Sequence, residues 1–296
     1  MRTHAEITPL TDAVADLVRD GDTVALEGFT HLIPVAAGQE LIRQRKRDLT
    51  LVRMTPDIVY DQLIGAGCAR KLIFSWGGNP GVGSLHRFRE AVQTGALEIE
   101  EHSHAGMANR YVASASGLPF AVMRGYNGTS LPEHTDTIKS ITCPFTGEQL
   151  TAVPALGLDV GIIHAQRADR QGNVLIEGIV GIQKEAVLAA KAAIVTVEEI
   201  VDDLHAPMNA CYLPHWVLSA VCEVPNGAHP SYAHGYYGRD NAFCKAWDTI
   251  SRERDTFLEW MKKHVMGTKD HEEFMRSAGV GTGARHASLS AATGSM

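Results

Sequence analysis

Short apolar runs of strand length alternate with amphipathic helical patterns through the N-terminal part of the chain. The runs are rich in β-forming residues, and apolar residues at helical spacing separate one run from the next. Strands and helices that alternate at this spacing form βαβ units, which place consecutive strands parallel. We therefore expect the α/β class, with an open, mostly parallel sheet flanked by helices. The expected strands are Thr23–Leu26, Leu49–Met54, Lys71–Ser75, Leu97–Glu101 and Pro119–Met123, and the helices between them include Val35–Arg43 and Asp57–Ile64.

The pattern loosens from residue 125, and the apolar core resumes near residue 159. Residues 125–155 are rich in turn formers and predict an excursion from the domain, not a domain boundary. We predict a single domain over residues 1–278, followed by a flexible tail of small and polar residues over 279–296. Further along the chain we expect the strands Asp159–His164, Val174–Ile176 and Ala193–Val197, and the helices Lys184–Lys191, Trp216–Val221 and Phe257–His264.

Composition and charge argue against several classes of protein. The chain has 296 residues, of which 45% are hydrophobic and 21% charged, as in an ordinary globular protein. A formal net charge of −7 argues against non-specific nucleic-acid binding, and no apolar run reaches membrane-spanning length. The N-terminus lacks an apolar signal core, so we expect a cytoplasmic protein. Five scattered cysteines without a Cys-x-x-Cys pair fit a reducing compartment and argue against a zinc site.

The first candidate site is the turn that follows the strand Thr23–Leu26. Ligands bind at the carboxyl ends of strands in open α/β sheets. Gly28 lacks a Cβ and lets the backbone approach a ligand closely, and the N–H groups at the start of the next helix favour an anion. The alternative is an ordinary βα turn, because glycine turns are common. The candidate residues here are Gly28, Phe29, Thr30 and His31.

The second candidate site follows the strand Lys71–Ser75 in the same strand–turn–helix context. Four glycines in the seven residues 77–83 leave the backbone free to line a ligand. The segment is neither a Walker loop nor a dinucleotide fingerprint, because the lysine and the glycine spacing of those motifs are missing. The alternative is a long turn before a helix. The candidate residues are Ser75, Gly77, Gly78, Asn79 and Gly81.

Two histidines and one glutamate are further candidates. His102 and His104 alternate after the strand Leu97–Glu101, which would place both on one face. No third metal ligand stands out, so we expect no metal site. We interpret both as polar residues at the mouth of a cleft, with His104 a candidate substrate contact. Glu177 precedes a glycine turn, a pattern too common to assign a catalytic role on its own.

Several motifs resemble the α-type (A-type) chains of the family I coenzyme A transferases. The run Asp-Gly-Asp-Thr-Val-Ala-Leu-Glu-Gly-Phe at residues 20–29 is similar to the N-terminal signature of these chains, which usually carry a second glycine at the position of Glu27. The Asn-Pro-Gly element at residues 79–81 is similar to one that follows the third strand in the family. Residues 196–200 and 227–231 resemble the longer A-type chains, those of the glutaconate CoA-transferase type.

The resemblance implies a CoA-transferase (NagB/RpiA-like) fold and a ping-pong reaction that moves coenzyme A from succinyl-CoA to 3-oxoadipate. In such a reaction a glutamate of a β-type (B-type) partner chain attacks the thioester and carries the coenzyme A. The present chain would contribute the substrate-binding wall and no catalytic residue, with Glu177 a look-alike of the nucleophile. Coenzyme A would be a substrate, with no permanently bound cofactor. The two types of chain would form a hetero-oligomer such as α2β2.

Three other functions stay open. A glutaconate transferase would share all of these motifs. In a related group of ring-cleaving hydrolases that act on coenzyme A esters, a catalytic glutamate lies near the position of His104, where this chain has an imidazole. A ligand sensor on this fold would usually add a DNA-binding head, and no basic helix-turn-helix precedes residue 8.

Overall fold

The main sheet is open, and its strands run parallel. The computed structural model describes residues 5–80 and 82–280. Neighbouring strands follow the order β1-β13-β11-β9-β2-β3-β4-β5, and every pair along this path is parallel. The expected α/β class is therefore confirmed. The strands are β1 Glu6–Ile7, β2 Thr23–Glu27, β3 Leu49–Val52, β4 Ala69–Phe74, β5 Glu98–Glu101, β9 Leu158–Asp169, β11 Ala190–Val201 and β13 Ala220–Glu223, with the antiparallel additions β10 Val174–Ile176 and β12 Cys211–Leu213.

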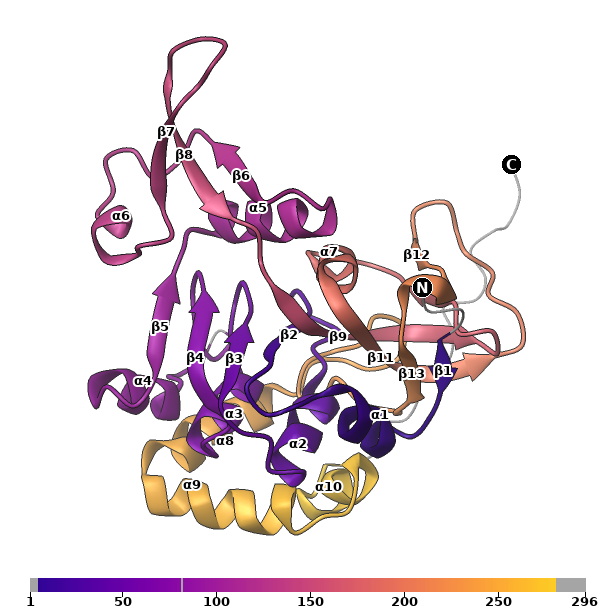
Figure 1. The fold of residues 1–296 in the computed structure, drawn as a ribbon. Helices are drawn as coiled ribbons and strands as arrows, with labels where there is room; N and C mark the ends of the chain where they lie inside the picture. Colours follow the sequence, from indigo (N-terminus) through magenta and orange to yellow (C-terminus); the bar gives the residue numbers. More distant parts are fainter. Residues whose placement is uncertain (1–4, 81, 281–296) are drawn as a thin grey trace, which may run out of the picture.

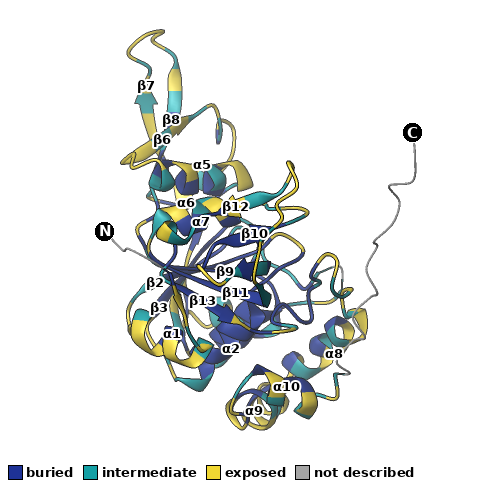
Figure 2. Ribbon diagram, turned by 90° about the vertical axis from the view of Figure 1, so that its right-hand side faces the viewer, coloured by how far each residue is buried: buried dark blue, intermediate teal, exposed yellow. Residues whose placement is uncertain are grey.

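Helices cover both faces of this sheet (Figure 1). Successive strand residues point to opposite faces: Val24 and Leu26 belong to the core shared with α2 and α3, whereas Ala25 belongs to the core shared with α5 and α7. Figure 2 shows the central strands buried beneath helices that are exposed on their outer sides. The helices are α1 Leu10–Leu17, α2 Val35–Arg43, α3 Ile58–Gly65, α4 His86–Gln93, α5 His104–Ala115, α6 Leu131–His134, α7 Gln183–Ala189, α8 Asn241–Arg252, α9 Arg254–Met261 and α10 His271–Ser277, with a 3₁₀ turn His215–Val217 and a π-helical segment Lys262–Met266.

The pairing of β2 with β9 joins two parts of the chain that are far apart in the sequence. Val24 lies opposite Val160, and Glu27 lies opposite Ile163. Helix α7 packs over this junction so closely that a Cβ at Gly161 of β9 would lie 2.6 Å from the carbonyl oxygen of Ala186. Packing between β9 and α7 therefore requires glycine at this position.

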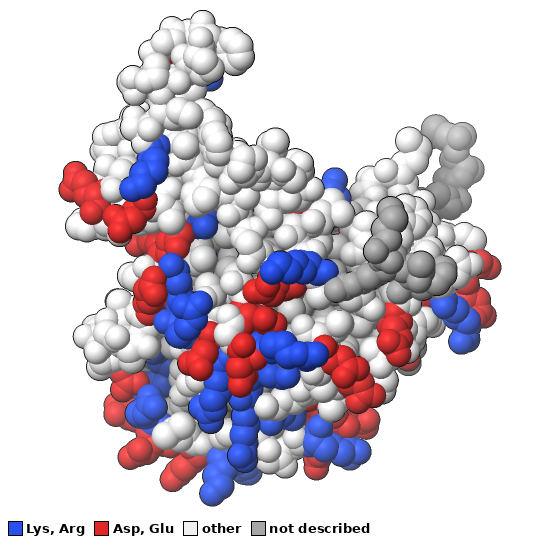
Figure 3. All heavy atoms as spheres, viewed as in Figure 1, with Lys and Arg blue, Asp and Glu red and all other residues white. Residues whose placement is uncertain are grey.

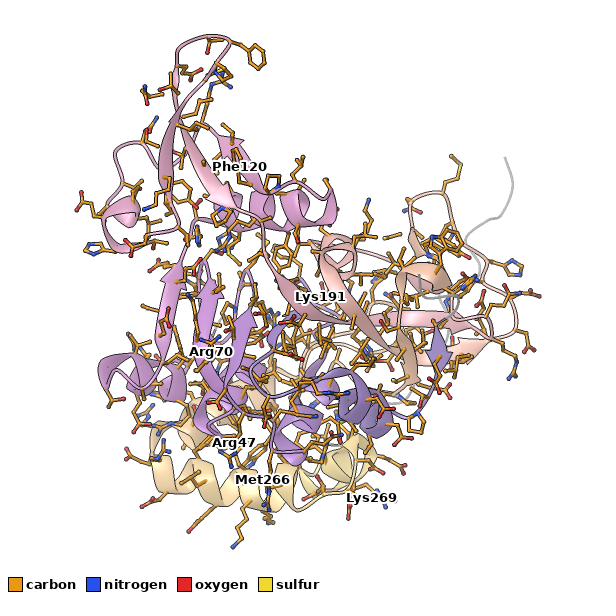
Figure 4. All side chains as sticks on the ribbon, in the orientation of Figure 1. Arg47, Arg70, Phe120, Lys191, Met266 and Lys269 are labelled. Carbon is orange, nitrogen blue, oxygen red and sulfur yellow. The ribbon has the colours of Figure 1, made fainter. Side chains whose placement is uncertain are left out.

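A smaller sheet projects beyond the carboxyl edge of the main sheet as an arm, defined here as residues 120–154 (Figure 1). Its inner face is closed by Tyr126, Ile138 and Val153. Phe120 lies on the arm with 42% of its surface exposed (Figure 4). The stretch 125–155 is rich in turn formers because it contains the connections of this sheet. The strands are β6 Phe120–Met123, β7 Lys139–Thr142 and β8 Gln149–Pro154, in the antiparallel order β6-β8-β7.

One element predicted from the sequence belongs to another sheet, and one is wrong. The strand predicted at Pro119–Met123 exists, but it belongs to the arm and not to the parallel series. The helix predicted at Trp216–Val221 is instead a 3₁₀ turn followed by β13. The apolar residues of β13 are buried between β1 and β11, and a short apolar run cannot be assigned to helix or strand by periodicity alone.

The C-terminal helices pack beneath the sheet (Figure 1). The helix predicted at Phe257–His264 is confirmed as α9 with its π-helical continuation, whereas α5, α8 and α10 have no counterpart among the predicted elements. Gly81 and residues 281–296, which include most of the predicted tail, lie outside the described residues.

Charged side chains of both signs are interspersed around the main sheet, whereas the tip of the arm carries almost none on the face seen in Figure 3. Arg70 on β4 and Lys191 on β11 mark two of these positions in Figure 4. Within residues 5–80 and 82–280, no helix combines the length and the apolar character needed to cross a membrane.

We predict that Gly161→Ala lowers the free energy of unfolding by about 1–3 kcal/mol, because the added methyl group overpacks the contact between β9 and α7. Gly157→Ala is the matched control, since a Cβ at Gly157 meets no atom within 4 Å. Urea unfolding followed by circular dichroism compares both variants with the parent chain. Equal stability of the two variants would contradict the packing assigned to Gly161.

Candidate functional site

Three turns follow β2, β4 and β5 and meet at the carboxyl edge of the main sheet, on the side from which the arm projects (Figure 1). Parallel strands end at the same edge, so residues far apart in the sequence converge there. The candidate residues predicted from the sequence lie in these turns, at the start of α5, or, for Glu177, in the loop after β10. Gly81 lies outside the described residues.

The turn after β2 doubles back sharply. A Cβ at Gly28 would lie 2.5 Å from the carbonyl oxygen of Leu32, so only glycine fits without moving the backbone. Thr30 and Leu32 have φ angles of 63° and 52°, in the left-handed region that non-glycine residues rarely adopt. Phe29 and Thr30 are exposed, and the Thr30 hydroxyl lies 3.2 Å from the hydroxyl of Tyr232. This turn therefore presents side chains from a strained, fixed backbone, a combination found at functional sites.

His31 faces the interior, with only 1% of its surface exposed. Its Nε2 lies 2.7 Å from the carbonyl oxygen of Ile179 and therefore donates to it. The ring stacks on Tyr232 with the ring centres 5.0 Å apart. Burial lowers the pKa of His31, which keeps the imidazole neutral near pH 7. His31 thus fastens the turn after β2 to the loop that contains Ile179.

The loop after β10, residues 177–181, packs directly on this turn. A Cβ at Gly181 would lie 2.6 Å from the Cβ of Phe29. The carboxylate of Glu177 pairs with the guanidinium of Arg167 at 2.5 Å, and the two side chains are 30% and 29% exposed. A carboxylate engaged by arginine has part of its charge neutralised. Glu177 lies near the three turns, but its ion pair does not prepare it for nucleophilic attack.

Ser75 and His104 come from different turns and form a hydrogen bond. Ser75 Oγ lies 2.6 Å from the carbonyl oxygen of Met54 and 3.1 Å from Nδ1 of His104. A hydroxyl has one proton, and the short contact to a carbonyl uses it. Nδ1 of His104 must therefore donate to Ser75, which in the neutral ring leaves Nε2 as an acceptor on an exposed side chain. His104 is thus a rigidly held imidazole with one nitrogen available to a ligand.

His102 has a different environment from His104, contrary to the prediction that both share one face of a strand. β5 ends before His102, and His104 begins α5. His102 is buried against Glu100 and Arg110: one carboxylate oxygen of Glu100 lies 3.2 Å from His102 Nε2 and 2.5 Å from Arg110 Nη1. Burial raises the pKa of Glu100, but His102, Lys71 and Arg110 outweigh it and hold that pKa below its usual range. This cluster is structural.

The turn after β4 is anchored on α8. Asn79 is buried, and its Nδ2 donates to the carbonyl oxygen of Cys244 over 2.7 Å. The three atoms nearest to a Cβ at Gly78 would all belong to the side chain of Trp76, which is 55% exposed. Backbone contacts therefore do not require glycine at Gly78 as they do at Gly28.

A small pocket of about 20 Å³, partly open to solvent, lies beside the turns after β2 and β4. Thr30 and Pro80 line it from the two turns, and Asp57, Arg239 and Cys244 line it from neighbouring segments. No group of three or more His, Cys, Asp or Glu side chains placed to hold a metal ion occurs in the part of the chain that the structure describes.

A buried carboxyl group, Glu27, lies directly before Gly28. Glu27 is 2% exposed, and its Oε1 accepts hydrogen bonds from the hydroxyl of Tyr111 at 2.7 Å and from the N–H of Met54 at 3.0 Å. Burial raises the pKa of Glu27 to about 7, although Arg53, Tyr111 and the Met54 amide each lower it. A carboxyl group with such a pKa next to a candidate site is itself a functional candidate.

Sequence reasoning missed Tyr111 and Tyr232, which bond to Glu27 and Thr30 respectively. Tyr111 lies on α5, a helix that was not predicted, and Tyr232 lies in an irregular segment after β13. No local pattern marks either tyrosine, so only the three-dimensional arrangement identifies them.

One family model and three known proteins match most of the chain. The model described as Coenzyme A transferase matches residues 7–223. The chain is 68% identical over 280 residues to the A-type chain of the 3-oxoadipate CoA-transferase of Pseudomonas knackmussii, and the match covers 94% of this chain and 99% of that relative. It is 28% identical to the cholesterol ring-cleaving hydrolase IpdA subunit of Mycobacterium tuberculosis over 92% of this chain and 98% of that relative. The crystal structure of glutaconate coenzyme A-transferase from Acidaminococcus fermentans superimposes with a TM-score of 0.88 at 34% identity, over 94% of each chain.

We predict that Glu27→Gln changes the pH dependence of stability. Between the pKa of an exposed glutamate, 4.5, and the folded value of about 7, the folded chain holds a proton that the unfolded chain has lost. The stability contributed by Glu27 is therefore largest below pH 4.5 and falls as the pH rises to 7. Relative to Glu27→Gln, the parent chain should lose about 1–3 kcal/mol of unfolding free energy between pH 5 and pH 8.

Urea unfolding at several pH values measures this difference. Glu133→Gln, at an exposed position of α6, is the control for removing one carboxyl group. A difference between the parent and Glu27→Gln that stays constant from pH 5 to pH 8 would show that Glu27 ionises normally.

Proposed function

The chain belongs to the coenzyme A transferase family as an A-type chain, and we propose that it forms part of an enzyme that moves coenzyme A from succinyl-CoA to 3-oxoadipate. The observation that carries this proposal is the near-complete alignment, at 68% identity, with the A-type chain of a 3-oxoadipate CoA-transferase. The site geometry is compatible with it, because an exposed imidazole and exposed Phe29 and Thr30 line one edge of the sheet.

The proposed reaction has two symmetrical halves. A carboxylate of the partner chain attacks the thioester carbonyl of succinyl-CoA. The C–S bond breaks, coenzyme A departs as the thiolate, and a mixed anhydride between succinate and the enzyme carboxylate remains. The thiolate then attacks the enzyme's own acyl carbon, which releases succinate and leaves an enzyme-bound thioester. The carboxylate of 3-oxoadipate repeats these steps in reverse order and leaves as 3-oxoadipyl-CoA. Each step passes through a tetrahedral oxyanion that fixed hydrogen-bond donors stabilise.

The contribution of this chain is to bind and orient the acyl group. We assign substrate contact to Phe29, Thr30, Ser75 and His104, which reach the surface at the turns. Gly77 and Gly78 would let the backbone approach the substrate. Gly28 is buried, and the space left by its missing Cβ is taken by the Leu32 carbonyl, so Gly28 shapes the turn and is not a substrate contact as the sequence predicted. The predicted contact at Gly81 remains a proposal from the sequence, because Gly81 lies outside the described residues. His31 and Asn79 are buried and would hold the turns in place.

The nucleophile is proposed to lie on a partner chain of the B type, as the A-type designation of the relatives implies. Two observations support this. Glu27 is sealed from solvent at 2% exposure, and Glu177 is paired with Arg167. Neither side chain offers a free carboxylate to a thioester. We propose a hetero-oligomer such as α2β2, with coenzyme A as substrate; the absence of a permanently bound cofactor and a cytoplasmic location remain predictions.

Two of the similar proteins point to alternative functions for this chain. The structural match to glutaconate coenzyme A-transferase keeps glutaconate as an alternative acceptor. The match to the ring-cleaving hydrolase is more distant, and His104 with its bond to Ser75 supplies an imidazole where that chemistry is expected to need a carboxylate.

We predict that the chain, purified with its partner, transfers coenzyme A from succinyl-CoA to 3-oxoadipate in preference to glutaconate and acetoacetate. The comparison of kcat/KM for the three acceptors measures this preference. His104→Ala should lower kcat/KM for 3-oxoadipate by about tenfold or more, because the variant loses the exposed imidazole that we propose as a contact to the acyl group. His205→Ala, an exposed histidine between β11 and β12, is the matched control.

A preference for glutaconate would assign the chain to the alternative transferase. Release of free coenzyme A without any acceptor would assign it to hydrolysis.

A further inference from the structure

Glu27 is an ionisable side chain in a place where burial opposes its charge. It is the last residue of β2, it is 2% exposed, and Gly28 follows it directly. A carboxylate in a protein interior is strongly unfavourable unless hydrogen bonds and an opposite charge compensate it. The groups that compensate Glu27 come from α5, whose first residue is His104, and from the segment after β3, which bonds to the turn after β4.

The carboxyl group connects three elements that end at the site. Its Oε1 accepts the hydroxyl of Tyr111 from α5 and the N–H of Met54 after β3, at 2.7 Å and 3.0 Å. Arg53, which is 1% exposed, supplies the opposite charge. Two buried guanidinium nitrogens of Arg53, Nε and Nη1, have no hydrogen-bond partner among the described residues.

The backbone of Met54 carries this connection to Ser75 and His104. The Met54 N–H donates to Glu27, while the Met54 carbonyl oxygen, in the next peptide group, accepts the Ser75 hydroxyl at 2.6 Å and the Ser75 N–H at 3.2 Å. The same Ser75 hydroxyl accepts from His104. Two consecutive residues, Arg53 and Met54, therefore transmit the position of a buried carboxyl group to an exposed imidazole.

Arg53 links the surroundings of Glu27 to the Gly28 turn. Its Nη2 donates to the carbonyl oxygen of Gly28 at 3.1 Å and lies 3.2 Å from a carboxylate oxygen of Asp57. Gly28 starts the strained turn that presents Phe29 and Thr30. The Gly28 turn and the Ser75–His104 pair are thus both connected to the same buried carboxyl group, that of Glu27.

We propose that Glu27 is a positioning residue of the transfer site, which fixes the separation between the Gly28 turn and the Ser75–His104 pair through Arg53 and the backbone of Met54. Glu27 touches no substrate, because it is sealed from solvent. The identity of the reaction rests on the proposed function, whereas the geometric role of Glu27 stands on its hydrogen bonds to Tyr111 and Met54 and on the nearby charge of Arg53.

Charged and titratable groups face Glu27 and Arg53 from every element packed on them: Arg53 itself, Asp57 and Tyr60 of the α3 segment, and Tyr111 of α5. Burial raises the pKa of Glu27 to about 7. Its charge therefore changes within the range in which activity can be measured, and the ionised form is the stronger hydrogen-bond acceptor.

The test compares three variants of the complex with its partner chain. Glu27→Gln keeps an acceptor oxygen but no charge, so its kcat/KM should equal that of the parent near pH 6 and fall about threefold or more below it near pH 8. Glu27→Gly removes the acceptor and should lower kcat/KM by about tenfold or more at both pH values. Asp61→Asn is the control: Asp61 is also buried, but it bonds to Phe88 and Trp247 and to no residue of the three turns.

A ratio of parent to Glu27→Gln activity that is constant from pH 6 to pH 8 would overturn the proposal, as would parental kinetics of Glu27→Gly. If Glu27→Gly does not fold, the pH dependence of kcat/KM in the Glu27→Gln variant becomes the test of the proposal. A complex that transfers coenzyme A to no acceptor would refute the proposed function instead. In that case a crystal structure of the Glu27→Gly complex decides: a Ser75–His104 contact lengthened beyond about 3.5 Å supports positioning, and an unchanged 3.1 Å contact overturns it.

Discussion

The parallel pairing of β2 with β9 is the interaction on which the rest of the site depends. It sets Glu27 opposite Ile163, and β10 then folds back on β9. The loop after β10 is thereby placed against the turn after β2, where Ile179 accepts from His31 and Gly181 packs on Phe29. No local motif could assemble these contacts, because they join segments from opposite halves of the chain.

The polar groups at the carboxyl edge of the sheet divide into two layers. The buried layer holds the turns: His31, Asn79 and Glu27 are each less than 4% exposed and each bond to a neighbouring segment. The exposed layer includes Thr30 and His104, whose side chains are accessible to a ligand. Each of the three buried side chains makes at least one hydrogen bond that holds its turn to a neighbouring segment and so keeps the exposed layer rigid, although Nδ1 of His31 and Oδ1 of Asn79 have no hydrogen-bond partner among the described residues. Side chains that orient an acyl group for reaction must be held rigidly in this way.

The sequence could predict what depends on local patterns. The apolar runs of β2, β3 and β4 and the glycine turns after two of them are local, and they identified the α/β class and the position of Ser75 and Gly28. The sequence predicted an excursion over residues 125–155, but the antiparallel sheet of the arm, helix α5 and the strand order depend on long-range packing and were not predicted. His102 and His104 show the limit most clearly: a spacing of two residues predicted one shared face, but a helix begins between them, so one is buried and the other exposed. The proposed substrates came from family resemblance, not from physical reasoning about the residues.

The central claim is that this chain supplies the substrate-facing wall of the site while the partner chain supplies the nucleophile. The most direct measurement is to incubate the complex with succinyl-CoA, reduce the enzyme-bound thioester with borohydride, and map the reduced residue by mass spectrometry. We expect the label on a glutamate of the partner chain, and neither label nor turnover from this chain alone. A label on Glu177 or Glu27 of this chain, or turnover by this chain alone, would contradict this claim.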